Sequence, residues 1–388
     1  MKSSWLRIAA VLATTCLGTG VGVSAWAQDG TIKIGVNEPL TGVVAASGNM
    51  VTAGTRIAAE EINAKGGVLG KKIQLIIEDN KSNPTEAAGV AEKLITRDKV
   101  PAMIGAWSST YTLAVMPKLL EYKVPMVVET SSADKITTSG NPYIFRISPT
   151  NSTEAKAFKR FIGQLGIKKA DFLVVNNDWG LGAAAEFSKM LKANGVTVNK
   201  SLNMDAAAQD LSAQLSSIKG TDSDTLFITT SVEQMTLLMK QAQALGMKRR
   251  IVTTGGTLPD QLIAQAGSAA DNSYHDAMFA PWFPDTAADP KAARSFIEAW
   301  KKAGLPPAGM PEGARGYDAV RVLALAITKA GAPDSEKIRK ALWEISYPGL
   351  TGHIKFEKVG PAGKESGQSP ASTHLVKIES GKVTLVSK

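Results

Sequence analysis

Hydroxyl-bearing side chains cluster directly after two short apolar segments of the chain. The first cluster is Gly105-Ala106-Trp107-Ser108-Ser109-Thr110, and the second is Glu129-Thr130-Ser131-Ser132. A turn that opens a helix leaves backbone N–H groups unpaired, and such groups bind anions together with nearby hydroxyls. Each turn by itself could be an ordinary helix cap. Because two such turns follow one another, we expect them to form a binding site for a carboxylate.

The elements that must position these two turns alternate between strands and helices. Residues 101–104 and 124–128 are typical of buried strands, as are residues 31–36 and 72–78. Residues 49–64 have the pattern of an amphipathic helix. Strands that alternate with helices at this spacing form βαβ units. We therefore predict an α/β fold with doubly wound parallel sheets.

The same alternation starts again after residue 150. A helix is expected at 154–165, and further strands are expected at 171–175, 196–204, 225–230 and 250–254. The chain therefore holds two successive α/β units of similar design. The last third of the chain adds helices at 290–303, 311–330 and 335–345, late strands at 352–357 and 373–386, and a segment at 359–369 that is expected to be a surface loop.

The first 27 residues have the pattern of a secretory signal peptide. Lys2 and Arg7 precede an apolar stretch, and Ala25-Trp26-Ala27 is a small-x-small cleavage signature. We expect cleavage after Ala27 and a periplasmic protein. A membrane anchor is the alternative, but the segment is short for a membrane span. Cys16 is the only cysteine, so the secreted chain contains none and must be held together by its core.

Composition and charge indicate a chain of more than one domain and argue against binding of nucleic acid. The chain of 388 residues is 44% hydrophobic and 20% charged, which is ample for more than one domain. The net charge is +9, or +7 once the two basic residues of the leader are removed (9 − 2 = 7), and the basic residues form no stripe interleaved with aromatics. We therefore expect no nucleic-acid partner. A monomer is expected.

No arrangement of residues indicates catalysis or a metal site. The three histidines are His275, His353 and His374, and none has a metal-binding partner at short spacing. His275 is expected to be a hinge or surface residue. The chain has no Gly-x-Ser-x-Gly motif, and Gly180-Leu181-Gly182 lacks the third glycine of a dinucleotide fingerprint. We expect neither enzymatic activity nor a cofactor.

Three stretches make the sequence resemble a known family. They are Ile32–Val36 with Pro39-Leu40-Thr41-Gly42, Glu60–Lys65 with Gly66-Gly67, and Ile104-Gly105 with Ser108-Ser109. The chain resembles the branched-chain amino-acid (leucine/isoleucine/valine) type of periplasmic substrate-binding protein that serves ABC importers, the type I class. The resemblance implies two doubly wound lobes, a hinge and a ligand cleft between them. It places 28–149 with 279–356 in the first lobe, and 150–278 with 357–388 in the second.

The resemblance also implies candidate ligand-binding residues. Ser109 matches a serine that binds the ligand carboxylate, and Thr130 and Ser132 match groups that bind carboxylate and ammonium. Trp179, in Trp179-Gly180-Leu181-Gly182, matches an aromatic of the second lobe. Further candidate positions are Ser47, which stands where the family often has an aromatic over the ligand, Trp107, Ser231, where another site aromatic would fall, and Gly255.

The sequence departs from the family where amino-acid binders place an acid for the ligand ammonium. This region reads Thr253-Thr254-Gly255-Gly256-Thr257, without a carboxylate. A buried ammonium without a counter-charge is costly. An aromatic or aliphatic carboxylate without an amine is therefore an alternative ligand. Another acid could instead replace the missing one, and the candidates are Glu38, Glu129, Asp178 and Asp276.

The expected function is therefore capture and delivery of a small ligand. Hinge closure would bring the second lobe over a carboxylate that the first lobe holds, and the closed form would dock on an ABC permease in the inner membrane. The ligand would be a branched-chain or related amino acid. The same fold could also present a ligand to a sensor, and the sequence does not separate transport from sensing.

Overall fold

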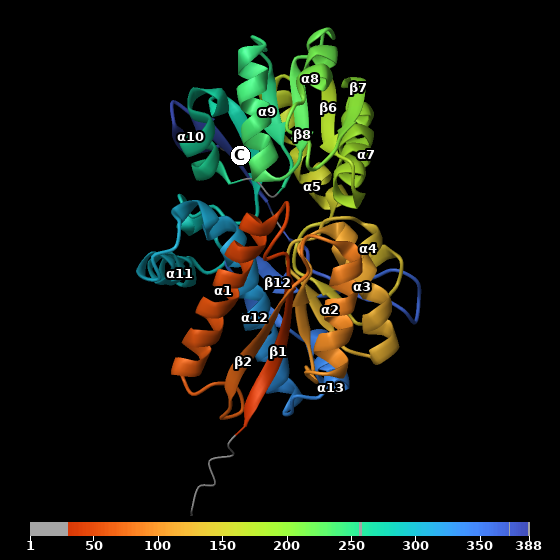
Figure 1. Cartoon of the computed structure of the whole chain (residues 1–388), viewed down its shortest axis with the longest axis vertical. Coiled ribbons are helices and arrows are strands. Elements are labelled where there is room, and N and C mark those ends of the chain that lie inside the picture. The colour runs from red at the N-terminus through yellow and green to blue at the C-terminus, as the bar shows by residue number, and fades with distance from the viewer. Residues whose placement is uncertain (1–29, 256–257, 372, 387–388) are drawn as a thin grey trace, which may run out of the picture.

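Two lobes, each built on a seven-stranded sheet, make up the part of the chain that the computed structural model describes (Figure 1). That part comprises residues 30–255, 258–371 and 373–386. The expected signal peptide at 1–27, with its cleavage after Ala27, lies outside the described residues, as do Gly256 and Thr257.

The first lobe contains a sheet in the order β13-β14-β5-β4-β3-β1-β2. Its five N-terminal strands are parallel, as the sequence predicts. The strands are β1 (Thr31–Glu38), β2 (Lys72–Asp79), β3 (Met103–Gly105), β4 (Met126–Val128), β5 (Ile144–Arg146), β13 (Glu357–Val359) and β14 (Ser366–Gln368). The helices are α1 (Ala45–Ala64), α2 (Pro84–Thr96), α3 (Ser109–Tyr122), α4 (Lys135–Thr138), α11 (Pro290–Lys302), α12 (Met310–Ala330) and α13 (Ser335–Leu342). A small hairpin joins β11 (Ser346–Pro348) to β12 (His353–Lys355).

The second lobe contains a sheet in the order β16-β15-β10-β9-β8-β6-β7. Its strands are β6 (Lys169–Val175), β7 (Thr197–Met204), β8 (Thr225–Thr229), β9 (Arg250–Thr253), β10 (Ser273–Ala277), β15 (His374–Glu379) and β16 (Lys382–Leu385). Its helices are α5 (Asn151–Phe158), α6 (Phe161–Leu165), α7 (Asp178–Ala193), α8 (Ser212–Lys219), α9 (Val232–Ala244) and α10 (Pro259–Ala266). The single late strand expected at 373–386 is a hairpin of β15 and β16.

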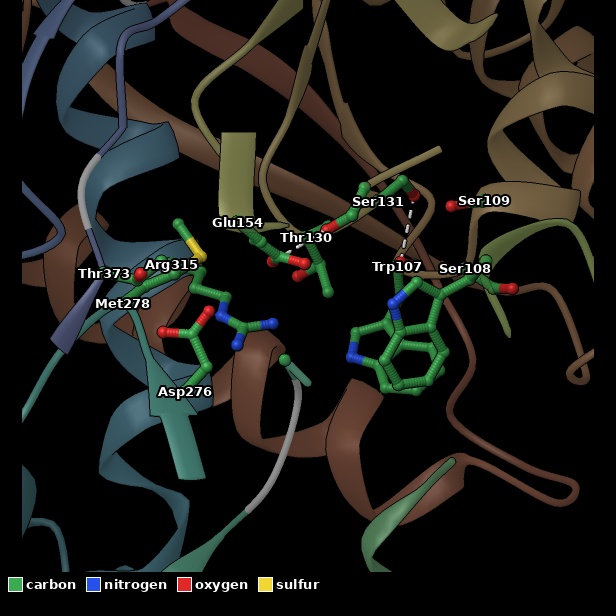
Figure 2. A pocket seen from close by; sticks show the side chains of 13 residues that line it. Trp107, Ser108, Ser109, Thr130, Ser131, Glu154, Asp276, Met278, Arg315 and Thr373 are labelled. Carbon is green, nitrogen blue, oxygen red and sulfur yellow. Dashed lines mark hydrogen bonds between the residues drawn. The ribbon is translucent and has the colours of Figure 1, made fainter. Parts of the chain in front are cut away.

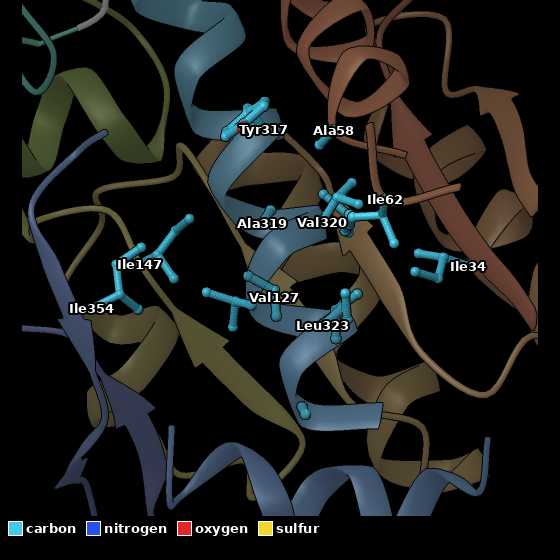
Figure 3. Packing of buried hydrophobic residues seen from close by; sticks show 14 of the residues in the cluster. Ile34, Ala58, Ile62, Val127, Ile147, Tyr317, Ala319, Val320, Leu323 and Ile354 are labelled. Atoms are coloured by element: carbon cyan, nitrogen blue, oxygen red, sulfur yellow. The ribbon is translucent and has the colours of Figure 1, made fainter. Parts of the chain in front are cut away.

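Alternating side chains of the first sheet divide its core into two layers. Ile104, Val127 and Phe145 pack with α1 and α12 on one face. Figure 3 shows Val127 together with Ile62 of α1 and Leu323 of α12. Met103 and Met126 point to the other face, where α2 and α3 cover them. This alternation follows from the two-residue period of a strand. Because β3 and β4 are parallel neighbours held by this packing, their C-terminal ends lie at the same edge of the sheet.

The segment after β12 departs from the sequence-based expectation. We expected 357–388 to lie in the second lobe, but only β15 and β16 do so, whereas β13 and β14 extend the first sheet beside β5. Within the surface loop expected at 359–369, residues 360–364 form an exposed turn, but Ser366–Gln368 form the buried strand β14. A Cβ atom on Gly367 would lie 2.5 Å from the Phe145 ring, so β14 can pack there only with a glycine. The small residue at position 367 is therefore a packing requirement and not a loop signal. The chain passes between the lobes after β5, after β10 and after β14.

Candidate functional site

The two hydroxyl turns, residues 105–110 and 129–132, lie side by side because β3 and β4 are neighbours in the first sheet. β3 also pairs with β1, which in turn pairs with β2. From β1 the chain goes first to β2, on one side of β1, and then to β3, on its other side. The sheet order therefore reverses between β1 and β3, and open α/β sheets form a ligand-binding crevice at such a switch point.

Hydrogen bonds lock the two turns together. Ser131 Oγ lies 2.7 Å from Thr112 Oγ1 and donates to the carbonyl oxygen of Trp107 at 3.0 Å (Figure 2). The N–H of Ala133 donates to Ser109 Oγ at 3.0 Å, which leaves the Ser109 hydroxyl proton to bind a ligand. The turns thus form one preorganised surface.

The start of α3 is available to an anion. Ser108 is the N-cap residue of α3, and its side chain makes no capping hydrogen bond. The alternative that this turn is an ordinary side-chain cap is therefore not what the structure shows. Thr130 Oγ1 is buried and has no hydrogen-bond partner among the described residues. Backbone N–H groups and hydroxyls together suit a carboxylate.

A cavity of about 470 Å³ separates the hydroxyl turns from the second lobe (Figure 2). Trp179, at the start of α7, and Gly255, after β9, reach it from the second lobe. Its lining comprises Trp107, Ser108, Ser109, Thr130, Ser131, Ser132, Glu154, Trp179, Gly255, Asp276, Met278, Arg315 and Thr373.

Two carboxylates of the second lobe face this cavity. Glu154, on α5, is 2% exposed, and its Oε1 lies 3.4 Å from Ser132 Oγ, which donates to it. Asp276, on β10, is 6% exposed. Burial raises the pKa of Asp276 to about 7, and burial together with the charge of Asp276 raises the pKa of Glu154 well above its ordinary value. Ionised carboxylates at these positions would be stabilised by a cationic ligand group.

A buried cation and three further buried carboxylates lie around this cavity or behind it. Arg315, on α12, lines the cavity and forms an ion pair of 3.2 Å with Glu312. The Trp107 ring donates from Nε1 to Glu312 at 3.3 Å, and the Trp107 N–H donates to Glu129 at 3.2 Å. Burial and the charges of Glu129 and Glu312 raise the pKa of Glu38. These contacts fix the orientation of Trp107.

Six of the eight candidate ligand-binding residues line this one cavity: Trp107, Ser109, Thr130, Ser132, Trp179 and Gly255. Ser231 instead lines a second cavity of about 380 Å³, which shares Trp107, Ser108 and Trp179 with the first. Ser47 is fully buried on α1 and lines neither of these cavities, so the structure does not bring it to the site.

Four acids were considered as partners of a ligand ammonium in place of the acid that is missing near Gly255, and they differ in location. Asp276 lines the cavity, whereas Glu38 and Glu129 are buried outside its lining. Asp178 makes contacts between the lobes, because it accepts hydrogen bonds from Thr110 at 2.7 Å and from Lys135 at 2.6 Å. The sequence therefore named one acid that lines the cavity.

Sequence reasoning missed Glu154 and Arg315 as lining residues. Glu154 belongs to the first helix after the first crossing, where a charged residue is ordinary. Arg315 and Glu312 stand three residues apart in the small-residue stretch Met310–Gly316. Charged residues in a stretch of this composition were a signal that could have been followed.

The described residues were also compared with the requirements of a metal site and of a membrane span. These residues contain no group of three or more His, Cys, Asp or Glu side chains that could hold a metal ion. None of the described helices combines the length and hydrophobicity needed to cross a membrane. His275 is not the hinge or surface residue that we expected; it is fully buried in β10.

A family model described as periplasmic binding protein matches residues 31–377. The chain belongs to this family. This periplasmic binding protein is 29% identical over 365 residues to the leucine-, isoleucine-, valine-, threonine- and alanine-binding protein of Pseudomonas aeruginosa, covering 93% of this chain and 94% of the relative.

Solved structures agree with the type I fold of this periplasmic binding protein. A leucine-binding protein from Thermotoga maritima is 30% identical with a TM-score of 0.81, over 92% of this chain and 98% of that one. A solute-binding protein of an ABC transporter from Rhodopseudomonas palustris, in complex with 3,4-dihydroxybenzoic acid, is 25% identical with a TM-score of 0.79, over 92% of this chain and 96% of that one. The relatives thus include binders of amino acids and of an aromatic carboxylate.

Proposed function

We propose that this protein is the periplasmic solute-binding component of an ABC importer, and that it captures a small amino acid between its lobes and delivers it to the permease. It would act as a monomer and would bind its ligand without chemical turnover. The carrying observation is that the cavity has two chemically different sides, with the Ser109 hydroxyl and the start of α3 on one, and the carboxyl groups of Asp276 and of Glu154, which lies beside Ser132, on the other.

These two sides suit the two charges of an α-amino acid. The ligand carboxylate would accept from Ser109 and from N–H groups at the start of α3. The ligand ammonium would donate to Glu154 and the Ser132 hydroxyl, which are already hydrogen-bonded to each other. The relatives from Pseudomonas aeruginosa and Thermotoga maritima, which are named as binding proteins for leucine or for leucine and other amino acids, support this class of ligand.

An aromatic carboxylate without an amine is the second candidate ligand. Trp107 and Trp179 offer ring surfaces in the cavity, and one relative is in complex with 3,4-dihydroxybenzoic acid. This ligand would leave Glu154 and Asp276 without a cationic partner, so we favour the amino acid.

Calorimetry on the secreted protein, freed of ligand by unfolding and refolding, tests the proposal. We expect binding of α-amino acids and weaker or no binding of their amine-free analogues. Ser109→Ala should weaken amino-acid binding by roughly 1–3 kcal/mol, the usual cost of an unsatisfied buried group. Ser216→Ala, which changes an exposed serine of the second lobe, is the matched control. Binding of 3,4-dihydroxybenzoate alone would favour the second candidate.

A further inference from the structure

We propose that the cavity selects an amino acid whose side chain ends in a carboxamide. The proposal rests on the proposed amino-acid-binding function and names the substrate class for the same site. It is carried by three charged side chains of the cavity lining. Asp276 and Arg315 lie away from Ser109, and Glu154 lies nearer to it, beside Thr130 (Figure 2).

Each of these three side chains is more than nine-tenths buried and has an atom without a partner. The exposed fractions are 2% for Glu154, 6% for Asp276 and 5% for Arg315. The unpartnered atoms are Glu154 Oε2, Asp276 Oδ2 and Arg315 Nε. A buried polar atom normally has a partner, so these atoms indicate that a polar group of the ligand completes the site.

Within the described part of the chain, the three groups form no ion pair with one another, although the positive charge of Arg315 partly offsets the effect of burial on the pKa of Glu154 and of Asp276. Arg315 pairs with Glu312 through Nη1, and no ion pair joins Arg315 to Glu154 or Asp276 among the described residues. The guanidinium and the two carboxylates therefore line one cavity while remaining more than ion-pair distance apart. A ligand group that both accepts and donates can lie between them.

The proposed orientation of the ligand assigns one of these carboxylates to the ammonium. Glu154 lies beside Ser132 and the hydroxyl turns, so it is the partner of the α-ammonium. Asp276 and Arg315 remain for the side chain, with Met278 and Thr373 beside them. A carboxamide oxygen accepts from Arg315, and the carboxamide NH2 donates to Asp276. Both charged groups then have a neutral, complementary partner.

Other side chains satisfy these groups less well. A branched aliphatic side chain would cover Asp276 and Arg315 without offering either a hydrogen bond, which is costly for buried charges. A side-chain carboxylate could pair with Arg315 but would then lie against the carboxyl groups of Asp276 and Glu154, and a side-chain ammonium could pair with Asp276 but would lie against Arg315. Only a group that both accepts and donates satisfies Arg315 and Asp276 together. Unpaired or repelled groups of this kind exclude competing ligands.

Calorimetry with glutamine, leucine and glutamate tests the selection on the wild-type protein. We expect glutamine to bind at least tenfold more tightly than leucine or glutamate. Leucine binding as tightly as glutamine would overturn this inference and leave the proposed function intact. Failure of all three amino acids to bind, with binding of 3,4-dihydroxybenzoate, would overturn the proposed function and this inference together.

The variant Asp276→Asn tests the assigned contact. Loss of the carboxylate removes the repulsion of glutamate, so the ratio of the glutamate to the glutamine dissociation constant should fall at least fivefold. Asp222→Asn, which changes a 67% exposed side chain of the same lobe, should leave the ratio unchanged. An unchanged ratio in a folded Asp276→Asn protein would overturn the inference, and the wild-type comparison decides the matter if this variant does not fold.

Discussion

Glu154 Oε1 lies 3.4 Å from the position that a Cβ atom would occupy on Gly255. Gly255 belongs to the turn where amino-acid binders that this chain resembles carry an acid for the ligand ammonium. The carboxylate of Glu154 thus reaches the same neighbourhood from α5, a different element of the second lobe. The absence of an acid at position 255 does not leave the cavity without a counter-charge.

We expect Glu154→Gln to weaken the binding of an α-amino acid by roughly 1–3 kcal/mol, since a buried charge–charge contact with the ammonium is lost. The substitution keeps the shape of the side chain, so the free energy of unfolding of the ligand-free protein should change little. Calorimetry measures the affinity. Glu298→Gln, at a 72% exposed position on α11, is the control. Equal losses of affinity for an amino acid and for its amine-free analogue would contradict this role.

Asp178 connects the lobes and should favour the closed state. Hydrogen bonds from Thr110, on α3, and Lys135, on α4, reach its carboxylate. Partial burial raises its pKa, but these hydrogen bonds hold the pKa of Asp178 below its ordinary value overall. Because the pair with Lys135 is partly exposed, we expect Asp178→Asn to destabilise the closed state by only about 0.5–1 kcal/mol.

This change should raise the ligand dissociation constant about two- to fivefold, because ligand binding and closure are coupled. Calorimetry gives the constant, and small-angle X-ray scattering shows whether the ligand-free protein becomes more open. Asp285→Asn is the control, since Asp285 pairs with Arg294 inside the first lobe. An unaltered affinity at low salt would show that the contact does not contribute to closure.

Gly54 marks the closest approach of α1 and α12. A Cβ atom at this position would lie 1.8 Å from the carbonyl oxygen of Gly313, so the helices would have to separate. We expect Gly54→Ala to lower the free energy of unfolding by about 1–3 kcal/mol or more. Gly89→Ala, in α2, meets no atom within 4 Å and should be neutral or stabilising by up to about 1 kcal/mol. Urea unfolding compares the two, and similar stabilities would contradict the packing described.

His275 should make the protein sensitive to acid. Its ring nitrogens lie 2.8 Å from Thr253 Oγ1 and 2.7 Å from Ser273 Oγ, and burial lowers its pKa to about 3. The unfolded chain, with a histidine pKa near 6.5, binds more protons between these values. Stability from the neutral ring is therefore fully present above pH ~6.5 and decreases as the pH falls toward about 3.

When the pH falls from 7 to 5, the free energy of unfolding of the wild type should decrease by about 2 kcal/mol more than that of His275→Gln. Its stability at pH 7 can be lower, so the comparison concerns the slope with pH. Urea unfolding at several pH values measures that slope. The exposed His353 provides the control, and His353→Gln should follow the wild-type profile. Parallel profiles for wild type and His275→Gln would refute this explanation.

Local patterns in the sequence predicted much of the fold and part of the site. Strand periodicity and helix signals depend on neighbouring residues, and they predicted the βαβ order of both lobes. The ends of neighbouring parallel strands meet at one edge, so Ser109, Thr130 and Ser132 could be expected near one another from local signals. The same reasoning misassigned β14, because the packing of Gly367 against Phe145 is not visible in composition.

The sequence by itself determined the alternating strands and helices that precede the last crossing, their order and the hydroxyl turns. The tertiary structure decided which charges face those turns: Glu154 comes from α5, Asp276 from β10 and Arg315 from α12. Their positions depend on how helices pack and how the two lobes meet, which no periodicity records. Burial then changes the chemistry of these groups, since the pKa of a carboxyl group depends on its surroundings in the folded protein.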